Sequence, residues 1–211
     1  MDYAKGLVKW LESNKVVVLV GVLLVLFLAL ATLSRPPVIN EKQSAIDFVL
    51  KDASGTYPNA TITVMKAEMQ GDKWKVDVKI SAEGHSACPR VFVRNYELLP
   101  IYFREEQTIK NCQVSGSIVF EEEAVAASAK TPRASAAASA GALGYATYIS
   151  REQVETARNC TSCPSAFSAP IAEMLLKIAP QNAWVVEWKA PALNESVFVV
   201  LNEKGEVLAE K

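Results

Sequence analysis

Residues 16–33 read VVVLVGVLLVLFLALATL, a run of eighteen residues without a single charge. As a helix this run would be about 27 Å long, close to the ~30 Å thickness of the hydrocarbon core of a bilayer. A helix in the core of a soluble domain normally keeps a polar stripe, and this run has none on any face. The run therefore predicts a transmembrane helix whose partner is the lipid bilayer.

The charges that flank residues 16–33 predict the orientation of that helix. Three lysines precede the run (Lys5, Lys9 and Lys15), and two basic residues follow it closely (Arg35 and Lys42). Because basic residues concentrate on the cytoplasmic side, we expect a single-pass protein of the cell membrane with a cytoplasmic N-terminus and an outer C-terminal domain. The alternative is a cleavable signal peptide, since Ala29-Leu30-Ala31 has the small-x-small form of a cleavage site, but the apolar run is longer than a typical signal.

The composition excludes several classes of function. The chain has 22 Lys plus Arg against 23 Asp plus Glu, a formal net charge of −1, whereas nucleic-acid binding needs a basic stripe. No G-x-S-x-G, glycine-rich phosphate loop or H-E-x-x-H occurs. The single histidine, His85, lies in a polar loop and is expected to be a surface residue. We therefore predict no catalytic residue and no cofactor.

The chain beyond the apolar run divides into segments with different patterns. Residues 1–15 form a cytoplasmic lead, and residues 34–40 (SRPPVIN) form a stiff linker. A first α+β half is expected at 41–120, an Ala/Ser-rich helix and connection at 121–150, and a second α+β half at 151–211.

Local patterns in the first half predict a helix and then strands. Asn40 with Gln43 resembles a capping box and is followed by an amphipathic helix at 41–52. Strict alternation at 73–81 marks a half-buried strand, which forms a hairpin with 61–69 across Gln70-Gly71-Asp72. Further strands are expected at 90–98, 101–108 and 117–120.

The second half is predicted in the same way. Acids at the start of 121–130 favour a helix there, whereas 131–147 is either a helix packed through small residues or a poorly ordered insertion. Ser150 with Gln153 opens a helix that ends at Arg158, and another helix is expected at 171–179. Alternation at 184–188 and apolar runs at 197–201 and 206–209 predict an antiparallel meander.

Both halves thus read as helix, proline, Asn-Ala and alternating strands with tryptophan, which suggests a degenerate duplication. The predicted fold class is α+β, with an N-terminal transmembrane helix followed by helices on antiparallel sheets.

The end of the chain, AWVVEWKAPALNESVFVVLNEKGEVLAEK (183–211), resembles small extracytoplasmic PepSY-type and cystatin-like domains. The stretch GDKWKVDVKISAEGHSACPRVFV (71–93) looks like uncharacterised membrane-anchored proteins of archaea. The first resemblance implies a helix across an antiparallel sheet and a non-catalytic binding or inhibitory role.

Four cysteines follow the apolar run, namely Cys88, Cys112, Cys160 and Cys163. An even count in an exported domain favours two disulfides, and three pairings are open. We expect Cys88 with Cys112 and Cys160 with Cys163, because each pair brackets one local segment. A zinc site is disfavoured because only one C-x-x-C occurs, so no metal is predicted. A redox dithiol at Cys160 and Cys163 is the sharper alternative, although prolines interrupt the segment that follows.

Two further sets of residues bear on function. Three sequons would accept glycan in an exporting compartment, and they begin at Asn59, Asn159 and Asn194. An aromatic cluster is the candidate binding face, against the alternative that it packs in the core, and it comprises Phe92, Tyr96, Tyr102 and Phe103.

The sequence predicts a non-enzymatic binding or scaffold protein that presents its sheet to another envelope protein or peptide. A thiol-disulfide protein using Cys160 and Cys163 is the alternative.

Overall fold

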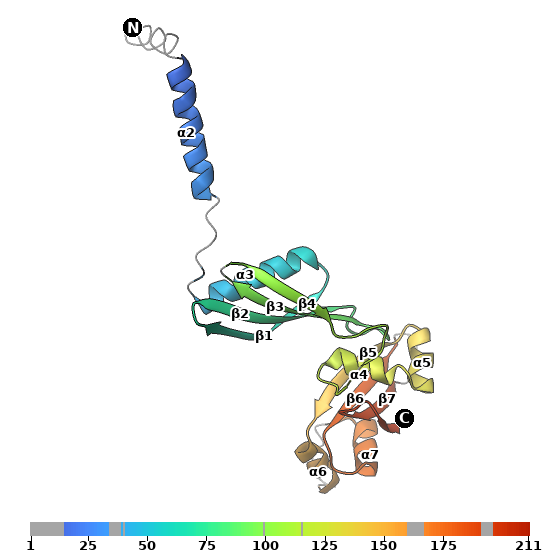
Figure 1. The fold of residues 1–211 in the computed structure, drawn as a ribbon. Coiled ribbons are helices and arrows are strands. Elements are labelled where there is room, and N and C mark those ends of the chain that lie inside the picture. The colour runs from blue at the N-terminus through green and yellow to red at the C-terminus, as the bar shows by residue number, and fades with distance from the viewer. Residues whose placement is uncertain are drawn as a thin grey trace, which may run out of the picture. The chain divides into compact units, whose positions relative to one another are not determined.

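The computed structural model describes residues 15–33, 39, 41–98, 100–114, 116–159, 167–190 and 196–211. Residues 1–14 of the predicted lead, and residues 34–38 and 40 of the predicted linker, lie outside the described residues. The chain divides into two compact units, Met1–Ile39 and Asn40–Lys211. The second unit is an α+β fold with two antiparallel four-stranded sheets (Figure 1).

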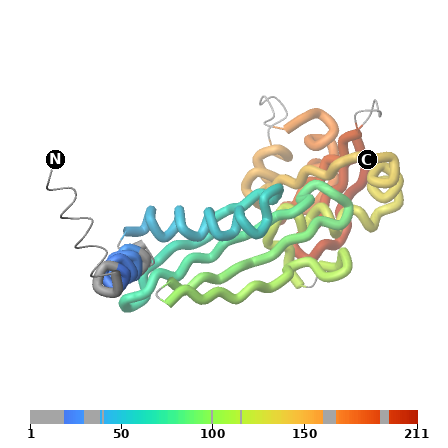
Figure 2. Tube along the Cα trace, turned by 90° about the horizontal axis from the view of Figure 1, so that it is seen from above, coloured from blue at the N-terminus to red at the C-terminus, as the bar shows by residue number. Residues whose placement is uncertain are grey.

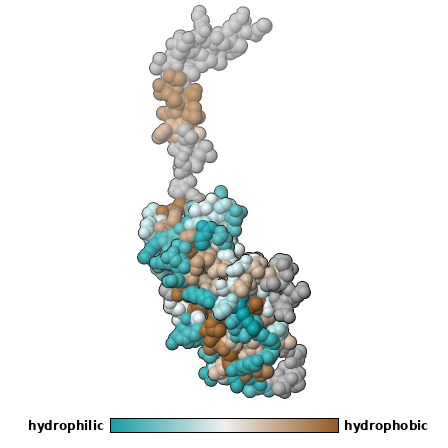
Figure 3. All heavy atoms as spheres, turned by 90° about the vertical axis from the view of Figure 1, so that its right-hand side faces the viewer, coloured by the Kyte–Doolittle hydropathy of each residue, from teal (hydrophilic) through white to brown (hydrophobic). Residues whose placement is uncertain are grey.

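The first unit contains α2 (Lys15–Leu33), a helix of 19 residues that coincides with the apolar run. Its large apolar side chains between Leu19 and Leu28 are each more than half exposed, and they form the brown stretch of this helix in Figure 3. Judged on the described residues alone, which in α2 include side chains only at 19–29, no helix is long and apolar enough to cross a membrane.

The first sheet of the second unit is a meander covered on one face by a helix. Its strands follow the order β1-β2-β3-β4, with bounds β1 (Thr61–Gln70), β2 (Lys73–Ala82), β3 (Arg90–Leu98) and β4 (Tyr102–Gln107). The helix α3 (Lys42–Thr56) runs along this sheet (Figure 2). Ala45, Val49 and Ala53 recur every four residues on α3 and are fully buried. The opposite face of the sheet carries the polar residues of the alternating pattern.

The second sheet lies between two pairs of helices. Its order is β5-β6-β7-β8, with bounds β5 (Leu143–Ile149), β6 (Ala183–Lys189), β7 (Val197–Asn202) and β8 (Val207–Glu210). Trp184, Val186 and Trp188 pack against α4 (Glu121–Ser128) and α5 (Pro132–Ser139). Ala183 and Val185 pack on the other side against α6 (Arg151–Asn159) and α7 (Ala169–Lys177). β6 is therefore buried on both faces, whereas its alternation predicted burial on one.

Several local predictions are confirmed. In the β1–β2 hairpin Gln70 pairs with Lys73 across a two-residue turn. Gly71 in this turn has a φ of 67°, a conformation that a Cβ would disfavour. At the start of α6, the side chains of Ser150 and Gln153 each accept a hydrogen bond from the backbone N–H of the other residue.

The first helix begins and ends differently from its prediction. The N-cap of α3 is Glu41. The side-chain amide of Gln43 donates a hydrogen bond to Asp47 one turn further along the helix, so this amide is used within α3. Asn40 lies outside the described residues. The helix continues past residue 52 to Thr56, and within its last turn Ser54 Oγ donates to the carbonyl of Leu50 at 2.6 Å.

The segment 117–120, which was predicted to be a strand, is irregular. Ile118 N–H donates one backbone hydrogen bond to Glu203 O at 2.7 Å, but no ladder follows it within the described residues. The prediction was wrong because a short apolar run does not by itself specify a strand: Ile118 is the buried residue of this segment, whereas Val119 is 66% exposed.

The Ala-rich segment 131–147 is ordered as α5 and β5. Thr131 Oγ1 accepts from Ala134 N, and Pro132 follows as the first helical residue, which together start α5. A Cβ added at Gly144 would lie 2.9 Å from Val125 Cγ1, so β5 passes α4 at a distance that only glycine permits. The small side chains thus serve close packing, as in the helical alternative, but residues 143–149 form a strand that neither alternative included.

Candidate functional site

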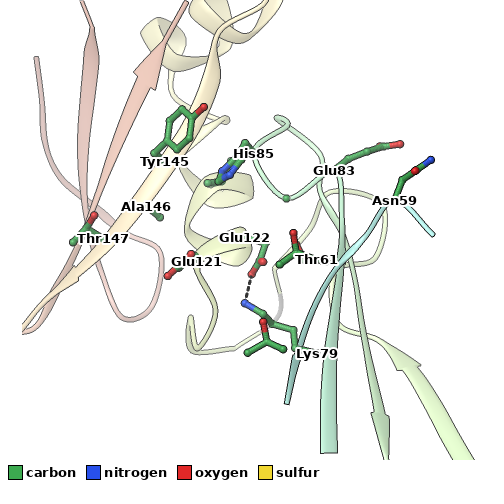
Figure 4. Close-up of a pocket in the computed structure, with 14 residues that line it drawn as sticks. Asn59, Thr61, Lys79, Glu83, His85, Glu121, Glu122, Tyr145, Ala146 and Thr147 are labelled. Carbon is green, nitrogen blue, oxygen red and sulfur yellow. Dashed lines mark hydrogen bonds and ion pairs between the residues drawn. The ribbon is translucent and has the colours of Figure 1, made fainter. Parts of the chain in front are cut away.

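A polar cavity of about 680 Å³ lies between the two sheets of the second unit (Figure 4). β1, β2, the β2–β3 loop, the N-terminal turn of α4, and β5 all contribute to its lining. We call it the β1–β5 cleft, and its central residues are Thr61, Thr63, Lys79, Ser81, Glu121 and Glu122. No pattern in the sequence pointed to it, because its walls are about 60 to 85 residues apart along the chain.

The two sheets present different surfaces to the β1–β5 cleft. The first sheet contributes alternate residues, Thr61 and Thr63 from β1 with Lys79 and Ser81 from β2, so it turns a face toward the cavity. β5 contributes three consecutive residues, 145–147. Because consecutive side chains of a strand point to opposite faces, such a run lines a cavity only where the strand turns its edge toward it.

A largely buried ion pair lies at the floor of the β1–β5 cleft. Lys79 Nζ is 3.1 Å from Glu122 Oε2, and the two side chains are only 14% and 8% exposed. Lys79 Nζ also lies 5.3 Å from the centroid of the Phe120 ring. These contacts neutralise Lys79 and Glu122 against each other. Glu121, by contrast, is exposed at the cleft, and its carboxylate makes no ion pair or hydrogen bond with any described residue.

His85 connects the β2–β3 loop to β5. Its backbone carbonyl accepts a hydrogen bond from Gly144 N at 2.9 Å, and its Nδ1 lies 3.1 Å from Gly144 O. Its ring packs on that of Tyr145 with 4.4 Å between the centroids. The side chain is exposed, as expected for a loop residue, but its contacts hold the first sheet beside the edge of β5.

The predicted disulfide between Cys88 and Cys112 is confirmed, with 4.9 Å between the two Cα atoms. It ties the β2–β3 loop, which carries His85, to the segment after β4. Cys160 and Cys163 lie outside the described residues, so their pairing and the redox alternative stay predictions. Nowhere in the described chain do three or more His, Cys, Asp or Glu side chains gather as a metal site.

The aromatic residues of the predicted binding face are divided between two sides of the first sheet. Phe92, Tyr96 and Phe103 lie on the α3 side, where Tyr96 is only 2% exposed and its ring is 5.4 Å from that of Phe103. Tyr102 pairs with Glu97 on the opposite face and is 63% exposed. Tyr96 is therefore a core residue, and the four rings do not form one surface.

Tyr96 belongs to a buried charged cluster around Arg94, whose side chain is 3% exposed. Arg94 Nε donates to Glu105 at 2.8 Å, and Arg94 Nη1 donates to Asp52 at 3.1 Å and to the Tyr96 hydroxyl at 2.8 Å. The guanidinium also lies 4.2 Å from the centroid of the Phe103 ring. This cluster joins the end of α3 to β3 and β4, so it fixes the helix on the sheet.

The cluster shifts the proton affinities of its members. Burial would lower the pKa of Arg94, but hydrogen bonds to Tyr96 and Glu105 outweigh this and raise it above its ordinary value. Burial, with a hydrogen bond to Asp52, raises the pKa of Tyr96 to about 12. The sequence carried a signal for this cluster, because Arg94 alternates in phase with Phe92 and Tyr96 on β3.

The predicted glycan acceptors lie apart from one another. Asn59 is exposed at the rim of the β1–β5 cleft, and Asn159 is exposed at the end of α6. Asn194 lies outside the described residues. Occupancy at any of the three stays a prediction.

The chain matches no protein-family model, no curated protein and no solved structure. The resemblance to PepSY-type, cystatin-like and archaeal membrane-anchored proteins therefore remains a prediction from the sequence patterns.

Proposed function

We propose that the chain is a membrane-anchored, non-enzymatic binding protein whose ligand site is the β1–β5 cleft. The anchor would be residues 16–33, with the N-terminus in the cytoplasm and the second unit outside. The single observation that carries the binding role is the cleft itself, a 680 Å³ polar cavity between two sheets that the loop of His85 holds together. Concave sites with a few convergent polar groups are the usual ligand sites of proteins.

The anchor is supported by the sequence of residues 16–33. A helix of eighteen uncharged and mostly apolar residues is stable in hydrocarbon. In water the same helix would be unfavourable, because its large apolar side chains between Leu19 and Leu28 are each more than half exposed. The outer location is supported by the Cys88–Cys112 disulfide, because disulfides persist in oxidising compartments.

The binding role is supported by the chemistry of the cleft lining. Thr61, Thr63 and Ser81 offer hydroxyl groups, and Glu121 offers a carboxylate without a partner among the described residues. The lining is thus suited to hold a ligand by hydrogen bonds and charge.

Site-directed photo-crosslinking in native membranes tests the binding role. A photo-crosslinking amino acid replaces Thr147 in the cleft, and in a matched control it replaces Glu152, which is exposed on α6 and does not line the cleft. We expect a discrete adduct from position 147 and none from position 152. Absence of an adduct at position 147, or the same adducts from both positions, would contradict the proposed site.

Membrane extraction tests the anchor. We expect the full-length protein to stay in the membrane through an alkaline wash and to be released by detergent. External protease should reach the second unit in intact cells. Release by the alkaline wash, or a mature N-terminus at Thr32, would refute the anchor without bearing on the cleft.

A further inference from the structure

β5 ends its sheet, and its free edge faces the β1–β5 cleft. Gly144 already pairs outward, because its N–H donates to His85 O at 2.9 Å and its carbonyl lies 3.1 Å from His85 Nδ1. In an antiparallel strand the residues whose N–H and C=O point to one side alternate. Ala146 and Tyr148 therefore also direct their backbone groups away from β6, as Gly144 does.

These two outward positions have no backbone partner among the described residues. His85 occupies only the first pairing position of the edge, so the next two remain unpaired, and the nearer of them, Ala146, lines the cavity. An unpaired strand edge inside a cavity is a template for an added strand, since main-chain hydrogen bonds supply affinity without requiring one sequence.

The chemistry around this edge indicates what the added strand would carry. Ser81 is 7% exposed and lines the cleft, and its hydroxyl has no hydrogen-bond partner among the described residues. Four of the described residues that line the cleft are Asp, Glu, Lys or Arg, and three of these are acids: Glu83, Glu121 and Glu122, with Lys79 as the only base. Glu122 is neutralised by Lys79, and Glu83 by Arg90, at 3.1 Å each. One carboxylate, that of Glu121, is left for a positive charge.

We infer that the β1–β5 cleft binds an extended peptide segment that adds to the edge of β5 and places a basic side chain beside Glu121. The inference rests on the proposed binding function and names its ligand class. The peptide main chain pairs with Ala146 and Tyr148, and a hydroxyl-bonding group of the peptide reaches Ser81. A volume of 680 Å³ accommodates a few residues of an extended chain.

Three peptide pools distinguish this binding mode from simple charge attraction. Each pool holds capped heptapeptides of Thr, Val and Ser around a fixed central residue. The central residue is Arg in the first pool and Glu in the second, and the third repeats the Arg pool with alternate backbone nitrogens methylated. Binding to the full-length protein in detergent is measured by fluorescence anisotropy, and amide exchange is followed by mass spectrometry over residues 144–149.

The Arg pool should bind and should slow amide exchange at 144–149. The Glu pool should bind at least about tenfold more weakly because its central residue has the wrong charge for Glu121. The methylated pool should also bind at least about tenfold more weakly, because it lacks half of its backbone N–H donors. Glu121→Gln should weaken binding of the Arg pool about three- to fivefold, since an exposed ion pair contributes only modestly to the binding free energy. Glu152→Gln on α6 is the matched control and should leave binding unchanged.

Ala146→Pro removes one outward N–H without breaking the ladder to β6, and it should abolish slowed exchange at 144–149. Its fold is checked by circular dichroism, and if it fails to fold, the methylated pool still decides the question. Equal binding of the methylated pool, or no slowed exchange with any pool, would overturn strand addition.

A crosslinked homodimer through position 147 would also overturn the inference, because a second copy of the chain would then occupy the edge. If an adduct forms at position 147 while all three pools fail, the peptide inference is wrong and the proposed binding function stands. If no adduct forms at all, the proposed function itself fails.

Discussion

Replacing Arg94 with methionine tests whether the buried charged cluster holds α3 on the first sheet. Methionine keeps most of the apolar stem but removes the guanidinium, which donates to Asp52, Glu105 and Tyr96. The two acids then lose their shared cation at the interface between helix and sheet. The variant should therefore be less stable than the wild-type protein.

The size of the loss follows from what the acids retain. The Tyr96 hydroxyl still donates to Asp52 at 2.6 Å, and the Tyr57 hydroxyl still donates to Glu105 at 2.8 Å. The side chains of Asp52 and Glu105 are also 41% and 25% exposed, so water replaces part of the lost contact. Removing one partner of a fully buried pair costs about 3–5 kcal/mol, so we expect a loss of about 2–3 kcal/mol here.

Urea denaturation of the full-length protein in detergent measures this loss, with circular dichroism and tryptophan fluorescence as readouts. Arg90→Met is the matched control, because Arg90 lies on the same strand and face but pairs with Glu83 at the surface, where the side chains are 56% and 62% exposed. An exposed pair contributes about 0–1 kcal/mol, so the control should stay close to the wild type.

A second substitution separates the lost charge from lost packing. Glu105→Gln in the Arg94→Met background removes one unpaired carboxylate and should restore part of the stability, whereas Glu105→Gln alone should destabilise the protein. If Arg94→Met costs no more than Arg90→Met, or if the double variant is less stable than Arg94→Met, the cluster does not act as described.

Three further predictions concern proton affinity and the disulfide. Tyr96 should ionise at a pKa of about 12, chiefly because it is buried, so its contribution to stability is complete below pH 10 and is lost as the pH rises toward 12; an ultraviolet titration should lack this late ionisation in Tyr96→Phe. Glu173 should have a pKa of about 2, because Lys177 and Lys211 donate to its carboxylate, so its contribution is present above pH 4.5 and is lost as the pH falls toward 2. The carboxyl carbon resonance that disappears in Glu173→Gln should report this value, and a midpoint near 4.5 would contradict it. Replacing both cysteines of the Cys88–Cys112 disulfide with serine should lower the free energy of unfolding by ~3 kcal/mol, as loop entropy predicts for a separation of 24 residues, and an unchanged urea midpoint would refute it.

Of the candidate site, the sequence predicted single residues but not their assembly. His85 was expected in an exposed loop and the Cys88–Cys112 pair beside it, and the structure has both. Tyr96 was a candidate either for a binding face or for the core, and it is buried, because its strand turns that side toward α3. Aromatic side chains fit either position, and the alternation of β3 does not say which face of the sheet a helix will cover.

The sequence by itself determined the elements whose causes are local. Alternation at 73–81 with Gly71 in the turn specified a hairpin, and Ser150 with Gln153 specified the start of α6, because pleat, turn and cap depend on residues a few positions apart. Uncharged residues at 16–33 likewise specified an apolar helix.

Only the tertiary structure decided where distant segments meet. β5 was not recognised in the Ala-rich segment, because its small residues are explained by α4 and Trp188, which lie close to Gly144 in space but not along the chain. The β1–β5 cleft exists because a face of one sheet and an edge of the other converge, and convergence depends on long-range packing that no local pattern encodes.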